Sequence, residues 1–428
     1  MPRVLARLGS APAARVLSEA LEIQDEALRT QILIALSRLP RMSPAPDGPL
    51  LQRALELELA EAHRLLSYAE DLGLPEQPAV HAVSPSSAEG AAALLALALD
   101  EQRFRSLERV LLLLGLLLTR LRAANLRPEL FRMQPGSDGT VSGHRGFALE
   151  LLDNLLPRDL GQRLLPLWDS GPRERRLADL VAYYPDAART PGGWLEWTRL
   201  GSMPWVHACA VHHAAHSSGT VGTAATALGS DDPRVREAGL TSLARLQVTI
   251  DAPVLERLSM DPDPGVRREA IRFSSRAARD TLGPVASPMI PTLERVLFLK
   301  AAELFSQLPG EELAPMAVLA TEEQYAAGTD VLRQGEIGDA LYLIVEGRVR
   351  MHRRGRVLAT LGPHDSFGEM EVLDPAPRFA TVTAETDVTL LKLAEADVRD
   401  LLQEKHELAL GIIQVLTRRL RTANRTKA

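Results

Sequence analysis

The sequence predicts a multidomain protein, with an all-α solenoid of paired helices followed by an antiparallel β-roll that has flanking helices. Three observations support this fold class. Apolar residues recur at three- and four-residue spacing from the N-terminus to about residue 300. One helical pattern returns along this stretch. After about residue 320 the apolar period changes to two, which is the period of a strand.

Composition fits packed helices in a reducing compartment. Of the 428 residues, 46% are hydrophobic and only 4% aromatic, and the net charge is −6. This length suits roughly two to four domains. A low aromatic content favours helices over sheets. The mildly negative net charge does not indicate a basic surface for nucleic acid. Because Cys209 is the single cysteine, no disulfide forms within the chain, and we expect a cytoplasmic location.

The most apolar stretch is Val110–Thr119, which lies between two arginines. It has about half of the roughly 20 apolar residues that a membrane span needs. It is typical of a buried core helix, so we expect no membrane span in this chain.

Breaks rich in Pro, Gly or Ser interrupt the helical stretch. We assign residues 1–220 to an α-helical repeat-like region, residues 221–297 to clearer repeats, and residues 298–428 to the roll with its C-terminal helices. The breaks within the first region are Pro40–Pro49, Leu72–Gly90, Gln134–Gly143 and Thr190–Gly193.

The returning pattern starts each time with an aspartate. Residues 232–246 read DPRVREAGLTSLARL and residues 263–277 read DPGVRREAIRFSSRA, with 25–39 (DEALRTQILIALSRL) as a distant copy. The aspartate would cap a helix, proline fits the first turn, and the aliphatic fourth residue would face a neighbouring helix. The pattern resembles HEAT repeats, which stack helix pairs into a solenoid. Unrelated amphipathic helices with similar caps are the alternative.

Short alternating segments predict the roll. Residues 349–351 alternate apolar and polar side chains, and Val357, Ala359 and Leu361 continue the alternation after a turn at Arg354 and Gly355. Further short apolar segments follow at 380–382 and 388–391, and the chain is helical again from Glu395. Several short strands bounded by Gly and Pro indicate an antiparallel barrel or roll.

Three sequence motifs follow one another in this part of the chain. Residues 335–347 read GEIGDALYLIVEG, residues 367–369 read FGE, and residues 377–382 read PRFATV. They resemble the cyclic-nucleotide-binding domain of kinase regulatory subunits, bacterial cyclic-AMP-responsive transcription factors and gated channels. The resemblance covers about residues 300–428 and implies that Phe367–Thr381 is a phosphate-holding loop.

The resemblance implies a role for each main residue of this loop. Gly368 lets backbone approach the ligand closely, and Glu369 accepts a hydrogen bond from the ribose 2′-hydroxyl. Backbone N–H groups of the turn Met370–Leu373 point at the phosphate. Arg378 supplies a forked cation for the phosphate oxygens.

Two residues depart from the family. A small residue is usual where Glu371 stands, and an inward-pointing carboxylate there would repel a phosphate. Ala, Ser or Thr is usual in place of Phe379, whose backbone N–H stays available. Loss of a hydroxyl there favours cyclic AMP over cyclic GMP. In a roll without ligand, Arg378 would instead pair with Glu369 or Glu371. The candidate binding residues are Gly368, Glu369, Met370, Glu371, Arg378 and Phe379.

In the family the last helix covers the base. Here Thr417–Asn424 takes that place, and Arg421 or Asn424 would reach a base edge. A solvated helix surface is the alternative for both side chains.

Other candidate chemistry is weaker. His212 and His216 are four residues apart, a spacing used by metal-binding helices. No HExxH glutamate and no CxxC supports them, so we expect no metal and a helix with some exposed histidines. The sequence has no GxxxxGK[ST] and no GxSxG motif, and we expect neither an enzyme nor a cofactor. After the roll, few residues are left for a helix-turn-helix, so we expect no nucleic-acid partner.

The order of parts, with ALELLDNLLP at 148–157, is also similar to the soluble tail of bacterial proteins that carry an ATP/ADP-translocase-like membrane half. The chain starts in what looks like the middle of a repeat, which leaves a membrane-protein partner or fusion open. The sequence thus predicts a non-enzymatic regulator that binds cyclic nucleotide and relays the event through the solenoid to a protein partner. The alternative is a protein-interaction scaffold whose roll no longer binds ligand.

Overall fold

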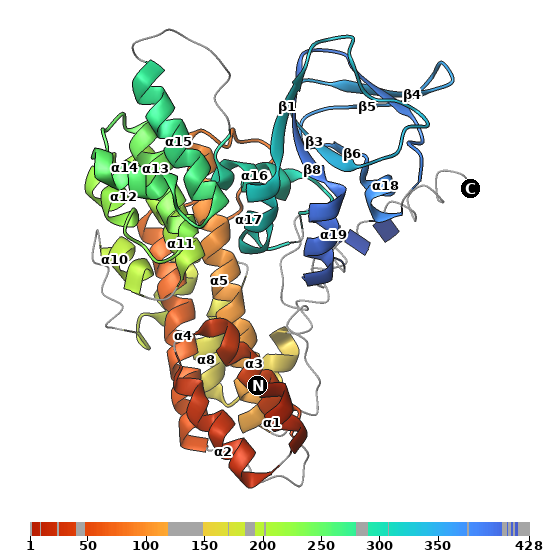
Figure 1. Cartoon of the computed structure of the whole chain (residues 1–428). Helices are drawn as coiled ribbons and strands as arrows, with labels where there is room; N and C mark the ends of the chain where they lie inside the picture. The colour runs from red at the N-terminus through yellow and green to blue at the C-terminus, as the bar shows by residue number, and fades with distance from the viewer. Residues whose placement is uncertain are drawn as a thin grey trace. The chain divides into compact units, whose positions relative to one another are not determined.

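The chain forms two compact units in the computed structural model, one from Met1–Gln77 with Leu95–His207 and one from Pro78–Leu94 with Ala208–Ala428 (Figure 1). The predicted boundaries after residues 220 and 297 stay predictions. The structure describes residues 2–8, 10–23, 25–39, 48–118, 149–169, 171–184, 193–200, 203–279, 290–306, 308–374, 376–404, 409, 412–413 and 416–417.

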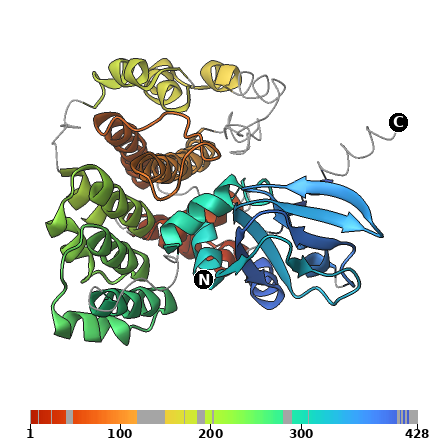
Figure 2. The same ribbon diagram turned by 90° about the horizontal axis from the view of Figure 1, so that it is seen from above.

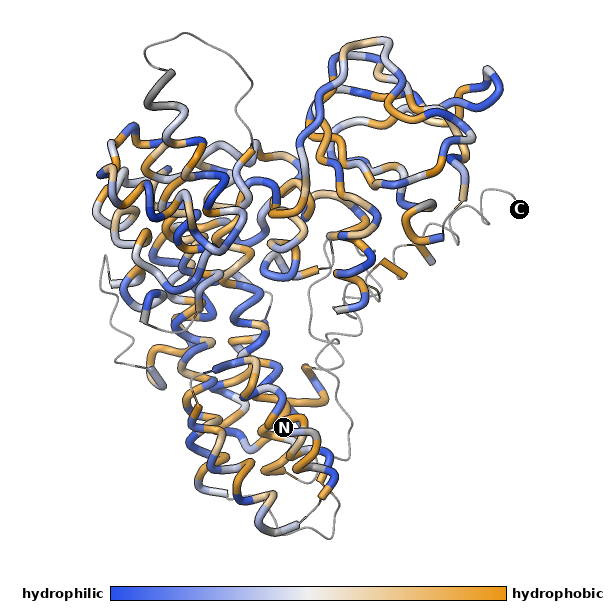
Figure 3. The backbone as a smooth tube through the Cα atoms, viewed as in Figure 1, coloured by the Kyte–Doolittle hydropathy of each residue, from blue (hydrophilic) through white to orange (hydrophobic). Residues whose placement is uncertain are grey.

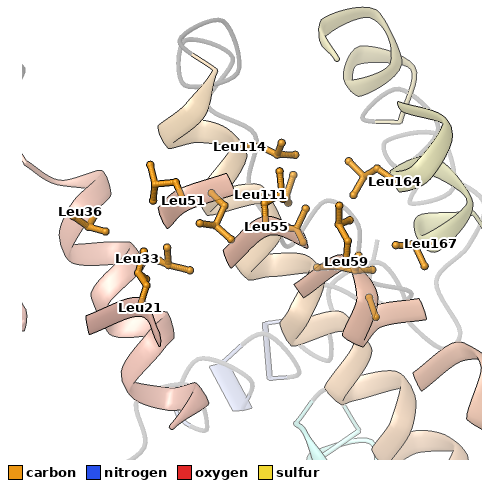
Figure 4. Close-up of a cluster of buried hydrophobic side chains, with 14 of the residues drawn as sticks. Leu21, Leu33, Leu36, Leu51, Leu55, Leu59, Leu111, Leu114, Leu164 and Leu167 are labelled. Carbon is orange, nitrogen blue, oxygen red and sulfur yellow. The ribbon is translucent and has the colours of Figure 1, made fainter. Parts of the chain in front are cut away.

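The first unit is helical and has a leucine-rich core. Leucines of several helices meet there, as Figure 4 shows for Leu33, Leu55, Leu111 and Leu164. Val110, predicted to lie in a core helix, is fully buried. The helices are α1 (Pro2–Leu8), α2 (Ala11–Glu19), α3 (Glu26–Ser37), α4 (Gly48–Asp71), α5 (Ala88–Leu117, which belongs to this unit from Leu95 on), α8 (Arg158–Trp168), α9 (Arg173–Leu180) and α10 (Gly193–Leu200), with a 3₁₀ turn at Ala20–Glu22.

Among the described residues, no helix combines the length and the apolar character that crossing a bilayer would require.

Successive helices pack side by side in the helical part of the second unit (Figure 2). Helix α12 packs on α13, and α13 and α14 both pack on α15. Helix α11 precedes them. Their bounds are α11 (Pro204–Ser217), α12 (Val221–Ala227), α13 (Pro233–Arg245), α14 (Ala252–Ser259) and α15 (Pro264–Arg279). The HEAT-like solenoid itself stays a prediction.

The predicted aspartate caps are confirmed. The Asp232 carboxylate accepts from the Arg234 N–H at 2.9 Å at the start of α13. The Asp25 carboxylate accepts from the Leu28 N–H at 2.9 Å at the start of α3. Asp263 accepts from the Gly265 N–H at 2.8 Å at the start of α15. A capping carboxylate satisfies N–H groups that have no partner within the helix.

The arginine of the repeated pattern also makes the same contacts twice. Arg236 donates to the carbonyls five and six residues before it, at 2.9 and 2.8 Å. Arg267 donates to the carbonyls five and six residues before it, at 2.7 and 2.5 Å. Arg236 further donates to both carboxylate oxygens of Asp261, at 2.9 and 2.8 Å. Each arginine thus joins its helix, α13 or α15, to the segment that precedes that helix, with the same pattern of hydrogen bonds.

The C-terminal part is a roll of two antiparallel four-stranded sheets, ordered β1-β8-β3-β6 and β2-β7-β4-β5. Arg354 and Gly355 have φ of 50° and 78° and form the predicted turn between β4 and β5. The strands are β1 (Thr321–Tyr325), β2 (Asp330–Leu332), β3 (Ala340–Glu346), β4 (Val349–Arg353), β5 (Arg356–Leu361), β6 (Ser366–Phe367), β7 (Thr381–Ala384) and β8 (Val388–Ala394). The predicted antiparallel roll is confirmed.

Flanking helices accompany the roll. Helices α16 (Thr292–Ala301) and α17 (Gly310–Leu319) precede it, α18 (Glu369–Leu373) lies between β6 and β7, and α19 (Glu395–Glu404) follows β8. The core of the roll contains apolar side chains of both sheets, among them Tyr342, Ile344, Val349, Phe367 and Leu390.

Candidate functional site

A left-handed turn at Gly368 opens the candidate loop. Strand β6 ends at Phe367, and Gly368, at φ 83°, caps helix α18. A Cβ added to Gly368 would lie 2.8 Å both from the Ala340 carbonyl oxygen and from Nη1 of Arg378. Glycine is the residue that accommodates both the positive φ and this close approach.

Arg378 is buried beside this turn, with 3% of its surface exposed. Its Nη2 donates to the Ala340 carbonyl at 2.7 Å, and its Nη1 donates to the Gly368 carbonyl at 3.2 Å. Asp339 Oδ1 lies 3.9 Å from Nη2. The sequence signal for Arg378 was its motif alone, and the two carbonyl partners were not predicted.

The backbone of Arg378 is held as well. Its N–H donates to the Glu336 carbonyl at 2.7 Å, and its own carbonyl accepts from the Gly335 N–H at 2.9 Å. Arg378 is therefore held both by its backbone and by its guanidinium, between the turn that starts α18 and the start of β3. A guanidinium carries five N–H donors in a planar fork, which suits the oxygens of an anion.

Phe367 anchors the loop to the sheet. Its ring stacks on the Tyr342 ring, with centroids 5.3 Å apart and planes 9° apart, and both side chains are buried. Burial raises the pKa of Tyr342. The stack holds the end of β6 against β3. Apolar packing therefore also fixes the position of Gly368, the next residue.

Phe379 points outward, with 47% of its surface exposed. The Arg353 guanidinium of β4 lies 4.2 Å from the centre of its ring, a cation–π contact. Sequence reasoning found Phe379 as a departure from the family but missed Arg353, because the two residues are distant in sequence.

The structure describes only some of the remaining predicted residues. Met370–Leu373 is helical within α18, as the predicted turn requires; Met370 is exposed and Glu369 half-buried. The side chain of Glu371 lies outside the described residues, and so do Arg421 and Asn424. The pairing of Arg378 with Glu371 and the contact with a base edge therefore stay predictions.

The histidines of α11 correct one expectation. His207 and His212 are buried, and His213 and His216 are half-buried, so the expected exposed histidines are wrong. Burial lowers the pKa of His212 to about 3, and its ring centroid lies 4.5 Å from that of His216. The described residues hold no group of three or more His, Cys, Asp or Glu side chains arranged for a metal ion.

The cyclic nucleotide-binding domain family matches residues 322–405, which include the two sheets, the loop and Arg378. The C-terminal part of this chain is therefore a cyclic nucleotide-binding domain, as found in cyclic-AMP-responsive regulators and kinase regulatory subunits.

Three relatives show the range of proteins that share this part. The chain is 32% identical over 135 residues to the CRP-like cAMP-activated global transcriptional regulator of Mycobacterium tuberculosis (30% of this chain, 60% of that protein). It is 36% identical over 131 residues to the Cyclic AMP receptor protein of Thermus thermophilus (29% and 61%). It is 37% identical over 107 residues to the cAMP-dependent protein kinase regulatory subunit of Yarrowia lipolytica (24% and 28%). The chain spans less than two thirds of the length of each.

Proposed function

We propose that this chain is a non-enzymatic regulatory protein that binds a cyclic nucleotide, preferably cyclic AMP, and relays the event through its helices to a protein partner. The supporting observation is the fixed, buried guanidinium of Arg378. A cation already held by the carbonyls of Ala340 and Gly368 needs little further ordering when an anion arrives. The relatives named for cyclic AMP support the choice of nucleotide.

Each part of the loop has a task in this proposal. Arg378 forms charge-assisted hydrogen bonds to the phosphate, each worth about 1.5–3 kcal/mol, or roughly ten- to hundredfold in affinity. The N–H groups at the start of α18 face the same anion. Glu369 accepts from the ribose hydroxyl.

The relay would run through α17. Nη1 of Arg234 in α13 donates to Glu311 in the first turn of α17 at 2.8 Å. Nη1 of Arg268 in α15 donates to the Val318 carbonyl in its last turn at 3.0 Å. Helix α17 also packs on α19, and α19 packs on α18. A shift of α18 on binding nucleotide therefore has a packed route to α13 and α15, provided the ligand prefers one arrangement.

The wider parts of the proposal rest on sequence and local geometry. The matching contacts of Arg236 and Arg267 support a HEAT-like solenoid. A single cysteine supports the cytoplasm. The likeness to the soluble tail of translocase-like proteins is compatible with the same regulatory role.

The alternative is a protein-interaction scaffold with a ligand-free roll. One observation favours it: the guanidinium of Arg378 donates to two carbonyls of the roll itself. A roll that satisfies its buried arginine internally is able to keep its fold without ligand.

Calorimetric titration with cyclic AMP and cyclic GMP separates the two. We expect saturable binding that is tighter for cyclic AMP and at least about tenfold weaker in Arg378→Ala. Arg350→Ala is the matched control, since Arg350 lies on the same roll with its side chain half-exposed. Absence of saturable binding below about a millimolar, or about 4 kcal/mol of affinity, would leave the scaffold as the function.

A further inference from the structure

The outer strand β5 leaves one edge of its sheet open. In the order β2-β7-β4-β5 it is the last strand, and among the described residues it pairs with β4 alone. Arg356, Val357 and Leu358 are exposed on it, Val357 at 52% and Leu358 at 44%. Such an edge presents a row of backbone N–H and C=O groups to another chain.

The hairpin that carries this edge is strongly basic. Residues 348–356 contain five arginines and one histidine, and no Asp or Glu occurs between Glu346 and Asp365. The whole chain has a net charge of −6, so this charge is local. The hairpin projects from the roll in Figure 1, and its tip is coloured hydrophilic in Figure 3.

Little in the described part of the chain neutralises these arginines. Arg350 lies 4.0 Å from Glu385, at the limit of an ion pair. No carboxylate of the described residues lies within ion-pair distance of Arg348, Arg354 or Arg356. The positive φ of Arg354 and Gly355 gives a tight two-residue turn, which fixes the backbone from which the arginines project.

We propose that the β5 edge and its basic hairpin bind an extended acidic segment of a partner protein by strand addition. Backbone hydrogen bonds to β5 would supply affinity. Alternate side chains of the added strand would place carboxylates near the arginines and apolar groups on Val357 and Leu358. Charges on an edge strand also prevent aggregation, but that protective role alone creates no affinity for an acidic strand. The inference does not depend on nucleotide binding.

The test uses the full chain and a fluorescein-labelled peptide of alternating Glu and Val, followed by fluorescence anisotropy. We expect saturable binding that weakens with added salt. The double variant Arg354→Glu/Arg356→Glu should bind at least about tenfold more weakly, because attraction becomes repulsion. The control Arg15→Glu/Arg53→Glu changes net charge equally at exposed sites of the helical part and should leave binding unchanged. Matching thermal unfolding curves exclude a folding defect.

Two further probes can overturn the proposal. The same peptide with every backbone nitrogen methylated has no N–H to donate to an edge strand, so equal binding of this peptide would refute strand addition. Binding of phosphatidylserine vesicles without binding of the acidic peptide would assign the surface to a membrane instead. Failure of the unmodified peptide to bind would refute the proposal outright.

Discussion

Gly368 lies directly against the guanidinium of Arg378, since a Cβ on Gly368 would stand 2.8 Å from Nη1 of Arg378. The same Nη1 donates to the Gly368 carbonyl. The turn and the cation therefore depend on each other. Any side chain at residue 368 either displaces the guanidinium or distorts the start of α18.

Gly368→Ala tests this dependence, with Gly328→Ala as the control. Both glycines have nearly the same φ, 83° and 84°, but a Cβ at Gly328 meets nothing within 4 Å. Each variant should lose about 1–2 kcal/mol of unfolding free energy from the left-handed backbone. Only Gly368→Ala should also bind cyclic AMP at least about tenfold more weakly. Urea unfolding and calorimetry measure the two effects, and equal affinities would contradict the dependence.

Local chemistry is what the sequence predicted well. The caps Asp25, Asp232 and Asp263 were found because a cap involves only neighbouring residues. The β4–β5 hairpin was found because strand alternation and a turn at Gly355 are local signals too. The loop motif around Gly368 located the candidate site from a local signal as well, and its binding role stays a prediction.

Contacts between distant segments were not predictable. Arg378 donates to Ala340, 38 residues away, and Arg353 covers Phe379 from another strand. The expectation of exposed histidines in α11 failed because the sequence does not show how many helix faces are covered. One sequence without tertiary structure shows which residues form a helix or strand, but not which segments pack on it.

Arg236→Leu should strongly destabilise the helical part. Arg236 and Asp261 form a two-bonded pair, and both residues are buried. Removing the cation leaves the Asp261 carboxylate with the Asp263 N–H as its remaining hydrogen-bond donor. Breaking such a pair costs about 3–5 kcal/mol. Arg64→Leu, at an exposed arginine of α4 that forms no ion pair with a described residue, should cost less than about 1 kcal/mol. Urea unfolding monitored by circular dichroism compares them, and similar midpoints would show that the pair contributes little.

The relay through α17 predicts coupling between Arg234 and nucleotide affinity. In a cycle of Arg234→Gln, Glu311→Gln and the double variant, the single changes should each shift the dissociation constant for cyclic AMP. Their effects should be non-additive by about 0.5–2 kcal/mol, because both remove one contact. Calorimetry on the four proteins measures this. Unchanged affinity in all four, with normal binding by the unaltered chain, would exclude this route and leave the nucleotide site intact.

Glu237 should make stability decline as pH rises. Its pKa is raised from 4.5 to about 7, mainly because the side chain is buried and also because of the nearby Glu269, while Thr292 and Arg268 oppose the shift. Its Oε1 has no hydrogen-bond partner among the described residues.

Between pH 4.5 and 7 the unfolded chain ionises this carboxyl while the folded chain keeps it protonated, so folding is disfavoured as pH rises. The loss is on the order of 3 kcal/mol. Glu237→Gln has no such carboxyl. Its stability relative to the unaltered chain should therefore increase from about pH 5 to about pH 8, a range that spans the two pKa values. Urea unfolding at a series of pH values measures the difference, with the exposed Glu256→Gln as control. Parallel stability curves for Glu237→Gln and the unaltered chain would mean that Glu237 is ionised in the folded protein, where Arg268 would then have to compensate a buried charge.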